Sequence, residues 1–319
     1  MNGKNYTKNV SVTVNQFKTA KDYVVANVEV TYPDGNVWVP EGFRISTDSA
    51  STVQGGIVIE DKDLNQFVWV PVATIAAYKR TAYSTNVATT ETDTATNSIK
   101  INLSSSKNSD YFTEALPEDE KTSVERYKGF YIGRYEAGDK ESTVAKTLRN
   151  SNDVTKTVTI KANQAPYNYV TRTQAESLAE GFATKQGYKA KTKLVSSYAW
   201  DTTIAFLQKV NSDYGSSSEE GNYSNTTFSY TDITGATKTK AKSSSVLVPT
   251  GQTTPVCNIY DMGGNVWEWT TESLSITGLR YANRGGNCSN NFASLPAGFR
   301  TGDSDSAYDS RGFRITLFM

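Results

Sequence analysis

The chain has 319 residues, in which 33 Lys and Arg balance 33 Asp and Glu, with no histidine and only two cysteines. The balanced charge indicates neither a nucleic-acid partner nor an acidic ligand. Without histidine, Ser-His-Asp, Cys-His and His-zinc chemistry are excluded. A mean hydropathy of −0.51 and the lack of a long apolar run predict no membrane span.

The N-terminal region is predicted to contain a small β element. The stretches VSVTVNQF and YVVANVEVTY are rich in β-branched residues, and a turn signal, PDGN, follows them. We therefore expect residues 1–34 to form a β extension or linker, and residues 35–319 to form one domain. VWVPEGF and GGIVIEDKDLNQFVWVPV predict further strands, two of them around the turn-like DKDLN.

The middle of the chain alternates polar insertions with regular elements. Residues 81–125 are rich in Thr, Ser, Asn and acids, which predicts a surface insertion with some local order. GFYIGRYEA (129–137) predicts a buried strand. Residues 173–187 predict a helix that begins with a capping box of Thr173 and Glu176.

A second helix is predicted in SYAWDTTIAFLQKV. Its expected core-facing residues are Trp200, Ile204, Leu207 and Val210. Two helices among short strands and long loops favour an irregular α+β domain.

IYDMGGNVWEWT (259–270) is the most informative motif. Trp267 and Trp269 lie two residues apart, so in a strand both face the same side. Gly263 and Gly264 allow a tight turn just before that strand. Taken alone, the motif indicates a core strand that follows a turn.

Together with other stretches, this motif resembles the formylglycine-generating enzyme/sulfatase-modifying factor family, a variant of the C-type lectin fold. VPEGF, FVWVPV, GFYIGRYEA, NYVTRTQAESLAEGF and SYAWDTTIAFL occur in family order, and YDMGGNVWEWT, RGGN and GFRITL resemble its C-terminal core. The resemblance covers about residues 37–319. It implies two helices packed on short antiparallel sheets, with long loops.

The resemblance also implies a structural calcium ion. The matching positions are Asp261, Gly264, Val266 and Glu268. Two carboxylates and two backbone carbonyls are hard oxygen donors suited to Ca²⁺. The alternative is that Asp261 caps a turn and Glu268 forms a salt bridge.

The cysteines depart from the pattern of the family's enzymes, which oxidise a substrate cysteine to formylglycine with a pair of active-site cysteines. Cys288 in RGGNCSNN lies near the position of the first, but no second cysteine follows, and Cys257 precedes the Trp motif. A copper site or thiol relay needs two thiolates. The sequence therefore favours a protein that is not an enzyme, with Cys257 as a small buried apolar residue.

The C-terminal segment, residues 284–319, resembles the variable region of another branch with this fold, the variable proteins of diversity-generating retroelements. In that branch, adenines of Asn codons are copied unfaithfully, which never yields Lys, Glu, Gln, Met or Trp. Residues 287–312 contain none of these five types. They make up about one residue in six of the chain, so about four would be expected. A Ser/Asn/Asp loop is the alternative explanation.

The resemblance implies a binding surface on a constant scaffold. Rigid anchors and adaptable polar groups are typical of such surfaces. The predicted anchors are Phe292, Phe299, Tyr308 and Arg311. Further binding positions are Cys288, Ser289, Asn291, Leu295, Thr301, Asp303 and Ser310, although Leu295 and Phe299 could instead be core residues. The expected fixed borders are Arg284, Gly285, Gly286, Gly312, Phe313 and Arg314.

The sequence thus predicts a non-catalytic receptor or adhesion protein whose partner is a protein or glycan on a cell or phage surface. We expect an extracellular, cell-surface or phage-displayed location, although residues 1–10 show no signal peptide. The alternatives are an oxidoreductase like the formylglycine-generating enzymes or a degenerate structural homologue. A calcium-dependent sugar lectin is a third, but its paired carboxylate motifs are missing.

Overall fold

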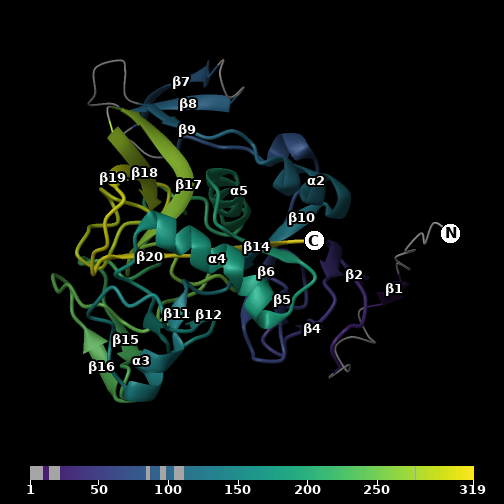
Figure 1. The fold of residues 1–319 in the computed structure, drawn as a ribbon, viewed down its shortest axis with the longest axis horizontal. Coiled ribbons are helices and arrows are strands. Elements are labelled where there is room, and N and C mark those ends of the chain that lie inside the picture. The colour runs from purple at the N-terminus through teal and green to yellow at the C-terminus, as the bar shows by residue number, and fades with distance from the viewer. Residues whose placement is uncertain (1–9, 14–21, 84–86, 94–97, 104–110, 277) are drawn as a thin grey trace.

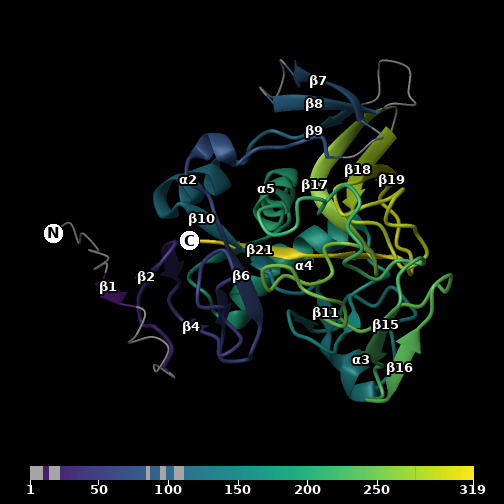
Figure 2. The same cartoon turned by 180° about the vertical axis from the view of Figure 1, so that it is seen from behind.

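The computed structural model describes residues 10–13, 22–83, 87–93, 98–103, 111–276 and 278–319. Short strands joined by long loops predominate, as expected for an irregular α+β fold. The N-terminal strands lie at one end of the molecule, and the strands of residues 267–304 lie at the other (Figures 1 and 2).

A six-stranded antiparallel sheet forms the centre of the fold. In spatial order its strands are β14 (Lys191–Leu194), β21 (Ile315–Phe318), β10 (Gly129–Gly133), β6 (Gln66–Pro71), β5 (Val58–Glu60) and β4 (Arg44–Ile45). The predicted strands in GFYIGRYEA and on both sides of DKDLN are confirmed. The last strand of the chain, β21, lies inside this sheet.

The first predicted helix is α4 (Arg172–Gln186). Its capping box is formed by Thr171 and Gln174. The Thr171 hydroxyl oxygen accepts a hydrogen bond from the Gln174 backbone N–H, and the Gln174 side-chain oxygen accepts one from the Thr171 backbone N–H. Thr173 and Glu176 do not form the predicted box, because the chain enters the helix two residues earlier.

The second predicted helix is α5 (Ser197–Leu207), and the hydroxyl of Ser196 caps its N-terminus. Three of its predicted core residues are buried: Trp200, Ile204 and Leu207. The prediction for Val210 was wrong: the helix ends at Leu207, and the Val210 side chain is 62% exposed.

Three short helices were not predicted: α2 (Glu118–Tyr127), α3 (Lys140–Ala145) and the 3₁₀ helix η1 (Ile75–Ala77). Neither α3 nor η1 buries a side chain, and two of the four residues that α2 buries are polar. Their sequences therefore lack the apolar periodicity that signals a helix. No helix in the described ranges has the length and apolar character needed to span a bilayer.

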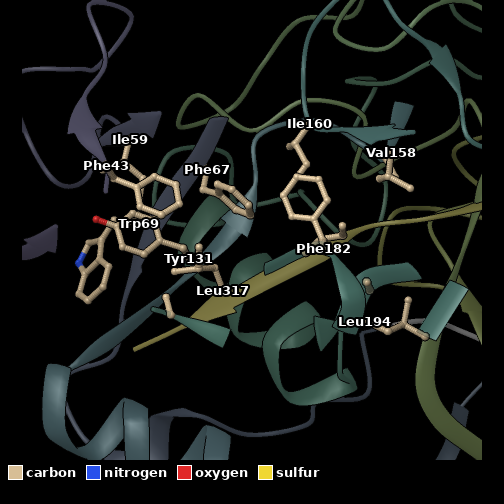
Figure 3. Packing of buried hydrophobic residues seen from close by; sticks show 14 of the residues in the cluster. Phe43, Ile59, Phe67, Trp69, Tyr131, Val158, Ile160, Phe182, Leu194 and Leu317 are labelled. Carbon is tan, nitrogen blue, oxygen red and sulfur yellow. The ribbon is translucent and has the colours of Figure 1, made fainter. Parts of the chain in front are cut away.

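Alternate residues of β6 enter two separate cores. Phe67 and Trp69 belong to one buried cluster, to which α4 contributes Phe182 (Figure 3). Val68 belongs to the other cluster, to which α5 contributes Trp200. Because both faces of the sheet are covered, FVWVPV is a continuous apolar run without polar alternation.

A second sheet contains two strands of the C-terminal segment. In spatial order its strands are β19 (Arg300–Ser304), β18 (Gly278–Arg284), β17 (Trp267–Ile276), β9 (Tyr111–Thr113), β8 (Ser98–Leu103) and β7 (Val87–Asp93). β20 (Arg311–Phe313) pairs in parallel with β17. The strands β7, β8 and β9 of the 81–125 insertion therefore extend this sheet beside β17 (Figure 1), whereas residues 118–125 belong to α2. Residues 84–86, 94–97 and 104–110 of the insertion lie outside the described residues.

Three small sheets complete the fold. Their strands are β1 (Val10–Thr13), β2 (Val28–Tyr32) and β3 (Gly35–Val39); β11 (Gly138–Asp139), β12 (Val158–Thr159) and β13 (Ala165–Pro166); and β15 (Phe228–Thr231) and β16 (Thr237–Lys240). The expected boundary at residue 34 falls inside the β2–β3 hairpin. Since Val30 and Val37 of this hairpin join the core next to β6, residues 28–34 pack with the domain.

Replacing Gly129 tests the packing of the central sheet. A Cβ at this position would lie 2.3 Å from the indole of the fully buried Trp69, so we expect Gly129→Ala to lower the free energy of unfolding by about 1–3 kcal/mol. Gly181→Ala in α4 is the matched control, since nothing lies within 4 Å of its Cβ position. There the change should stabilise the protein by about 0.5–1 kcal/mol. Urea unfolding of both variants measures the difference; equal effects would contradict this packing.

Candidate functional site

Five charged side chains form a buried ion-pair network under the C-terminal segment. They are Arg80, Asp201, Glu272, Arg284 and Arg300, each 2% exposed or less. Asp201 of α5 pairs with Arg284 (2.7 Å) and Arg300, while Glu272 of β17 pairs with Arg300 (3.0 Å) and Arg80. Arg284 and Arg300 are opposite each other on β18 and β19. The network therefore fixes both ends of residues 284–300 to α5 and β17.

Two neighbouring carboxyl groups have opposite pKa shifts. Burial alone would raise the pKa of Glu272, but the guanidinium groups of Arg300, Arg80 and Arg284 lower it to about 2. Glu114 accepts hydrogen bonds from the Ser197 N–H and the Thr271 hydroxyl. Burial raises the pKa of Glu114 to about 8, and the nearby negative charge of Glu272 contributes to the rise. At neutral pH, Glu272 is ionised and Glu114 keeps its proton.

A second buried pair fixes the other border of the segment. Arg314 binds both carboxylate oxygens of Glu268, at 3.0 and 2.7 Å, and donates to the carbonyls of Gly133 and Tyr260. Such a bidentate pair combines charge with fixed geometry. It connects the beginning of the last strand to β17 and to β10.

The resemblance implied four calcium ligands: Asp261, Gly264, Val266 and Glu268. In the structure, Glu268 already binds Arg314, and Asp261 accepts a hydrogen bond from the Thr253 hydroxyl (2.8 Å). Across the described residues, no three His, Cys, Asp or Glu are grouped as a metal site. In the observed geometry the Glu268 carboxylate is paired with a guanidinium, as in the salt bridge that was the alternative interpretation. Calcium binding stays a prediction, which a rise in melting temperature on addition of Ca²⁺ would support.

The segment is held through its backbone near residues 297–299. The indole N–H of Trp200 donates to the carbonyl of Ala297 (3.0 Å). The guanidinium of Arg284 donates to the carbonyls of Gly298 (3.0 Å) and Phe299 (3.1 Å). Every residue type offers the same carbonyl acceptor, so these contacts do not involve the side chains at 297 and 299. Position 298 requires glycine, since a Cβ there would lie 2.5 Å from the carbonyl oxygen of Gly215.

Residues 221–227, which we call the flanking loop, bind the backbone of the segment in the same way. Both the N–H and the hydroxyl of Ser224 donate to the carbonyl of Asn290 (2.8 Å each). The side-chain oxygen of Asn225 accepts from the N–H of Phe292 (3.2 Å). The path of the chain at 290–292 is therefore fixed from outside the segment.

A third backbone attachment lies at residues 309–310. The Asn168 side chain donates to the carbonyl of Asp309 (2.6 Å), and the backbone N–H of Trp267 donates to the carbonyl of Ser310 (2.8 Å). The segment is thus attached to the scaffold through its carbonyl or N–H groups at three places. This arrangement allows the accessible side chains between the borders to vary without displacing the chain.

None of the eleven predicted binding residues is buried. Three are exposed: Ser289, Asn291 and Tyr308. Eight are half-buried: Cys288, Phe292, Leu295, Phe299, Thr301, Asp303, Ser310 and Arg311. All six expected border residues are buried: Arg284, Gly285, Gly286, Gly312, Phe313 and Arg314. The contrast between borders and interior agrees with a fixed frame around accessible positions.

Four of the predicted residues lie together around Trp267. The ring of Phe299 lies 6.1 Å from that of Trp267, and Arg311 is opposite Trp267 in the β17–β20 pairing. The Arg311 guanidinium lies over the ring of Tyr308 (4.1 Å) and pairs with Asp303. We call these five residues the aromatic–arginine cluster. Such residues are the types that dominate binding energy at protein interfaces.

Two further predicted residues lie against the flanking loop. Asn291 accepts a hydrogen bond from the Asn225 side chain (2.9 Å), and the ring of Phe292 packs edge-on against that of Tyr223 (6.2 Å). The predicted positions therefore form two groups, one around Trp267 and one beside the flanking loop.

The two thiols do not form a reactive pair. Burial raises the pKa of the Cys257 thiol to about 11, and burial also raises the pKa of the Cys288 thiol. The thiolate is the nucleophilic and metal-binding form, so both groups are poor nucleophiles at neutral pH. Cys257 is buried, as predicted.

Sequence reasoning missed several residues that build this surface. Arg300 lies inside the segment but is fully buried in the ion-pair network. Ser224 and Asn225 lie in a Ser/Thr/Lys-rich stretch whose composition indicates only a loop. Trp267 was placed in the core motif, but its side chain is half-buried, whereas that of Trp269 is fully buried. No periodicity or spacing in the sequence distinguishes these residues.

Comparison with protein families identifies the class. The model of the sulfatase-modifying factor enzyme 1-like domain matches residues 6–317, so the chain belongs to this family. The family resemblance inferred from the sequence motifs is thereby confirmed. No curated protein matches the chain.

Several solved structures are similar to the chain. CarF shares 14% identity (TM-score 0.41; 60% of this chain and 87% of CarF covered). PvdO from Pseudomonas aeruginosa shares 15% identity with a TM-score of 0.42, and the match covers 82% of this chain and 98% of PvdO. Treponema denticola variable protein 1 shares 13% identity with a TM-score of 0.43, and the match covers 80% of this chain and 96% of that protein. Likeness at this level carries no information about activity.

Removing Arg300 tests the buried network. Arg300→Ala leaves Asp201 and Glu272 short of a buried partner and should lower the free energy of unfolding by about 3–5 kcal/mol. Arg311→Ala is the matched control, because Arg311 forms a partly exposed pair with Asp303 and should cost about 1 kcal/mol or less. Chemical denaturation gives both values, and a small loss for Arg300→Ala would rule out a structural role for the network.

The raised pKa of Glu114 predicts a pH dependence of stability. Between its ordinary value of 4.5 and about 8, the unfolded chain has released this proton while the folded protein retains it. Stability should therefore fall as pH rises through this window, by up to about 1.4 kcal/mol per pH unit. Glu114→Gln cannot titrate and should remove this slope in urea titrations from pH 5 to 8. An unchanged slope in the variant would refute the assignment.

Proposed function

We propose that the chain is a non-catalytic binding protein whose segment 284–319 is diversified by adenine-directed mutagenic retrohoming. The observation that carries this proposal is the mode of attachment: the scaffold holds the segment by its backbone and by buried borders, while the eleven predicted positions remain accessible. The absence of the five unreachable residue types from 287–312 supports the same conclusion.

The partner in this proposal is a protein or glycan on a cell or phage surface, and the chain itself is displayed outside the cell or on a phage particle. A diversified surface needs rigid anchors that contact the partner without reorganisation. Phe299, Tyr308 and Arg311 supply such groups in the aromatic–arginine cluster.

Family membership favours a second candidate, an oxidoreductase related to the formylglycine-generating enzymes. The raised thiol pKa values of Cys257 and Cys288 are unfavourable for that chemistry, because it requires thiolates. Turnover of a cysteine-containing sulfatase peptide with added copper, lost in Cys288→Ser, would establish the enzyme and overturn the binding proposal.

The proposal predicts that accessible positions tolerate change. The triple variant Ser289→Tyr, Asn291→Asp, Tyr308→Ser should alter the free energy of unfolding by about 1 kcal/mol or less, because all three side chains are exposed. Trp200→Phe is the control: it deprives the Ala297 carbonyl of its donor and should cost about 1–3 kcal/mol. A large loss in the triple variant would mean that the segment's side chains hold the fold.

The genomic arrangement provides an independent test. We expect a near-identical copy of the DNA that encodes residues 284–319, differing only at adenines, beside a reverse-transcriptase gene. Differences at other bases, or the absence of a copy, would exclude retrohoming as the source of diversity.

A further inference from the structure

The half-buried Trp267 lies among four of the predicted binding residues. It lies on β17, outside residues 284–319, and its backbone is tied to Ser310. Its ring contacts that of Phe299, and its strand partner is Arg311. Two predicted variable residues thus lie beside Trp267: Phe299, which precedes β19, and Arg311, which lies in β20.

Trp267 supplies an indole, a side chain that the diversified positions cannot acquire. Copying errors at the adenines of Asn codons never produce a tryptophan, and residues 287–312 contain none. Tryptophan is nevertheless among the side chains most enriched at the energetic centres of protein interfaces. An indole can therefore enter this surface only from a constant strand such as β17.

The residues around the Trp267 indole also indicate the class of partner. Arg311 is paired with Asp303 and stacked on Tyr308, and the ring of Phe299 packs against that of Trp267. Tryptophan, tyrosine and arginine side chains are enriched among the residues that dominate the energetics of protein–protein interfaces, so the aromatic–arginine cluster favours a protein surface as the partner.

Resting on the proposed function, we infer that Trp267 is a constant recognition residue shared by all variants of the segment, and that the partners are proteins. Each partner places an apolar or aromatic side chain against the indole. The variable residues around it then decide which protein surface fits, while Trp267 supplies a contact common to every complex.

A display library tests this inference. The eleven predicted positions are randomised with the codons reachable from Asn codons in the full chain on yeast. The library is then selected separately on hen egg-white lysozyme, on ubiquitin and on biotinylated mannan. Trp267→Ala and Trp267→Phe are introduced into several independent binders, and melting temperatures confirm that each variant is folded. Trp38→Ala, at a half-buried tryptophan in β3 at the other end of the molecule, is the matched control.

We expect the library to yield binders to both proteins. Trp267→Ala should lower the affinity of every binder by at least about tenfold, and Trp267→Phe should lower it less. Trp38→Ala should leave the affinity unchanged. If folded Trp267→Ala or Trp267→Phe binders keep their full affinity, the constant role of Trp267 is overturned while the proposed function stands. Binders to mannan alone would overturn the protein class of partner. A library that yields no binder to any probe would remove the proposed function, and this inference with it.

Discussion

The C-terminal segment depends on buried arginines that are paired with buried carboxylates. Arg284 and Arg300 share the carboxylates of Asp201 and Glu272, and Arg314 occupies both oxygens of Glu268. A buried charge is tolerated only while its partner stays in place, since an uncompensated ion in the interior costs several kcal/mol. These pairs connect helix α5, strand β17 and the beginning of β21, so the ends of the segment are fixed by the same contacts that join the two sheets.

Between these borders, the scaffold contacts the backbone of the segment. Trp200, Ser224 and Asn168 all donate to carbonyl oxygens of the segment rather than to its side chains. Backbone groups are identical in every sequence except at proline, so such contacts keep one chain path for many side-chain sets. In this chain, buried borders and backbone contacts hold the segment, while the eleven predicted binding residues stay exposed or half-buried.

The sequence predicted most of the central architecture. The apolar runs at 66–71 and 129–133 and the amphipathic pattern of α4 are strong local signals, because they reflect burial against the sheet.

Other features could not be predicted from local patterns. Helix α3 was missed because it buries no side chain. The ion-pair network was missed because Arg80, Asp201 and Glu272 are far apart in the chain, and charged residues leave no periodic signal. The calcium ligands followed from resemblance alone, which could not reveal that Arg314, 46 residues after Glu268, would meet that carboxylate. Trp267 and Trp269 share a motif, and only packing separates the accessible indole from the buried one.

The position of β21 has a consequence for how such a chain is made. This strand lies at the end of the segment and, in the sheet, between β14 and β10, so the central sheet cannot close until residues 315–318 have left the ribosome. A chain that loses its reading frame within the segment lacks the strand that joins both halves of the sheet, and such chains are removed by cellular proteolysis. If the segment is diversified as proposed, folding would retain only those chains whose reading frame is intact through residues 315–318.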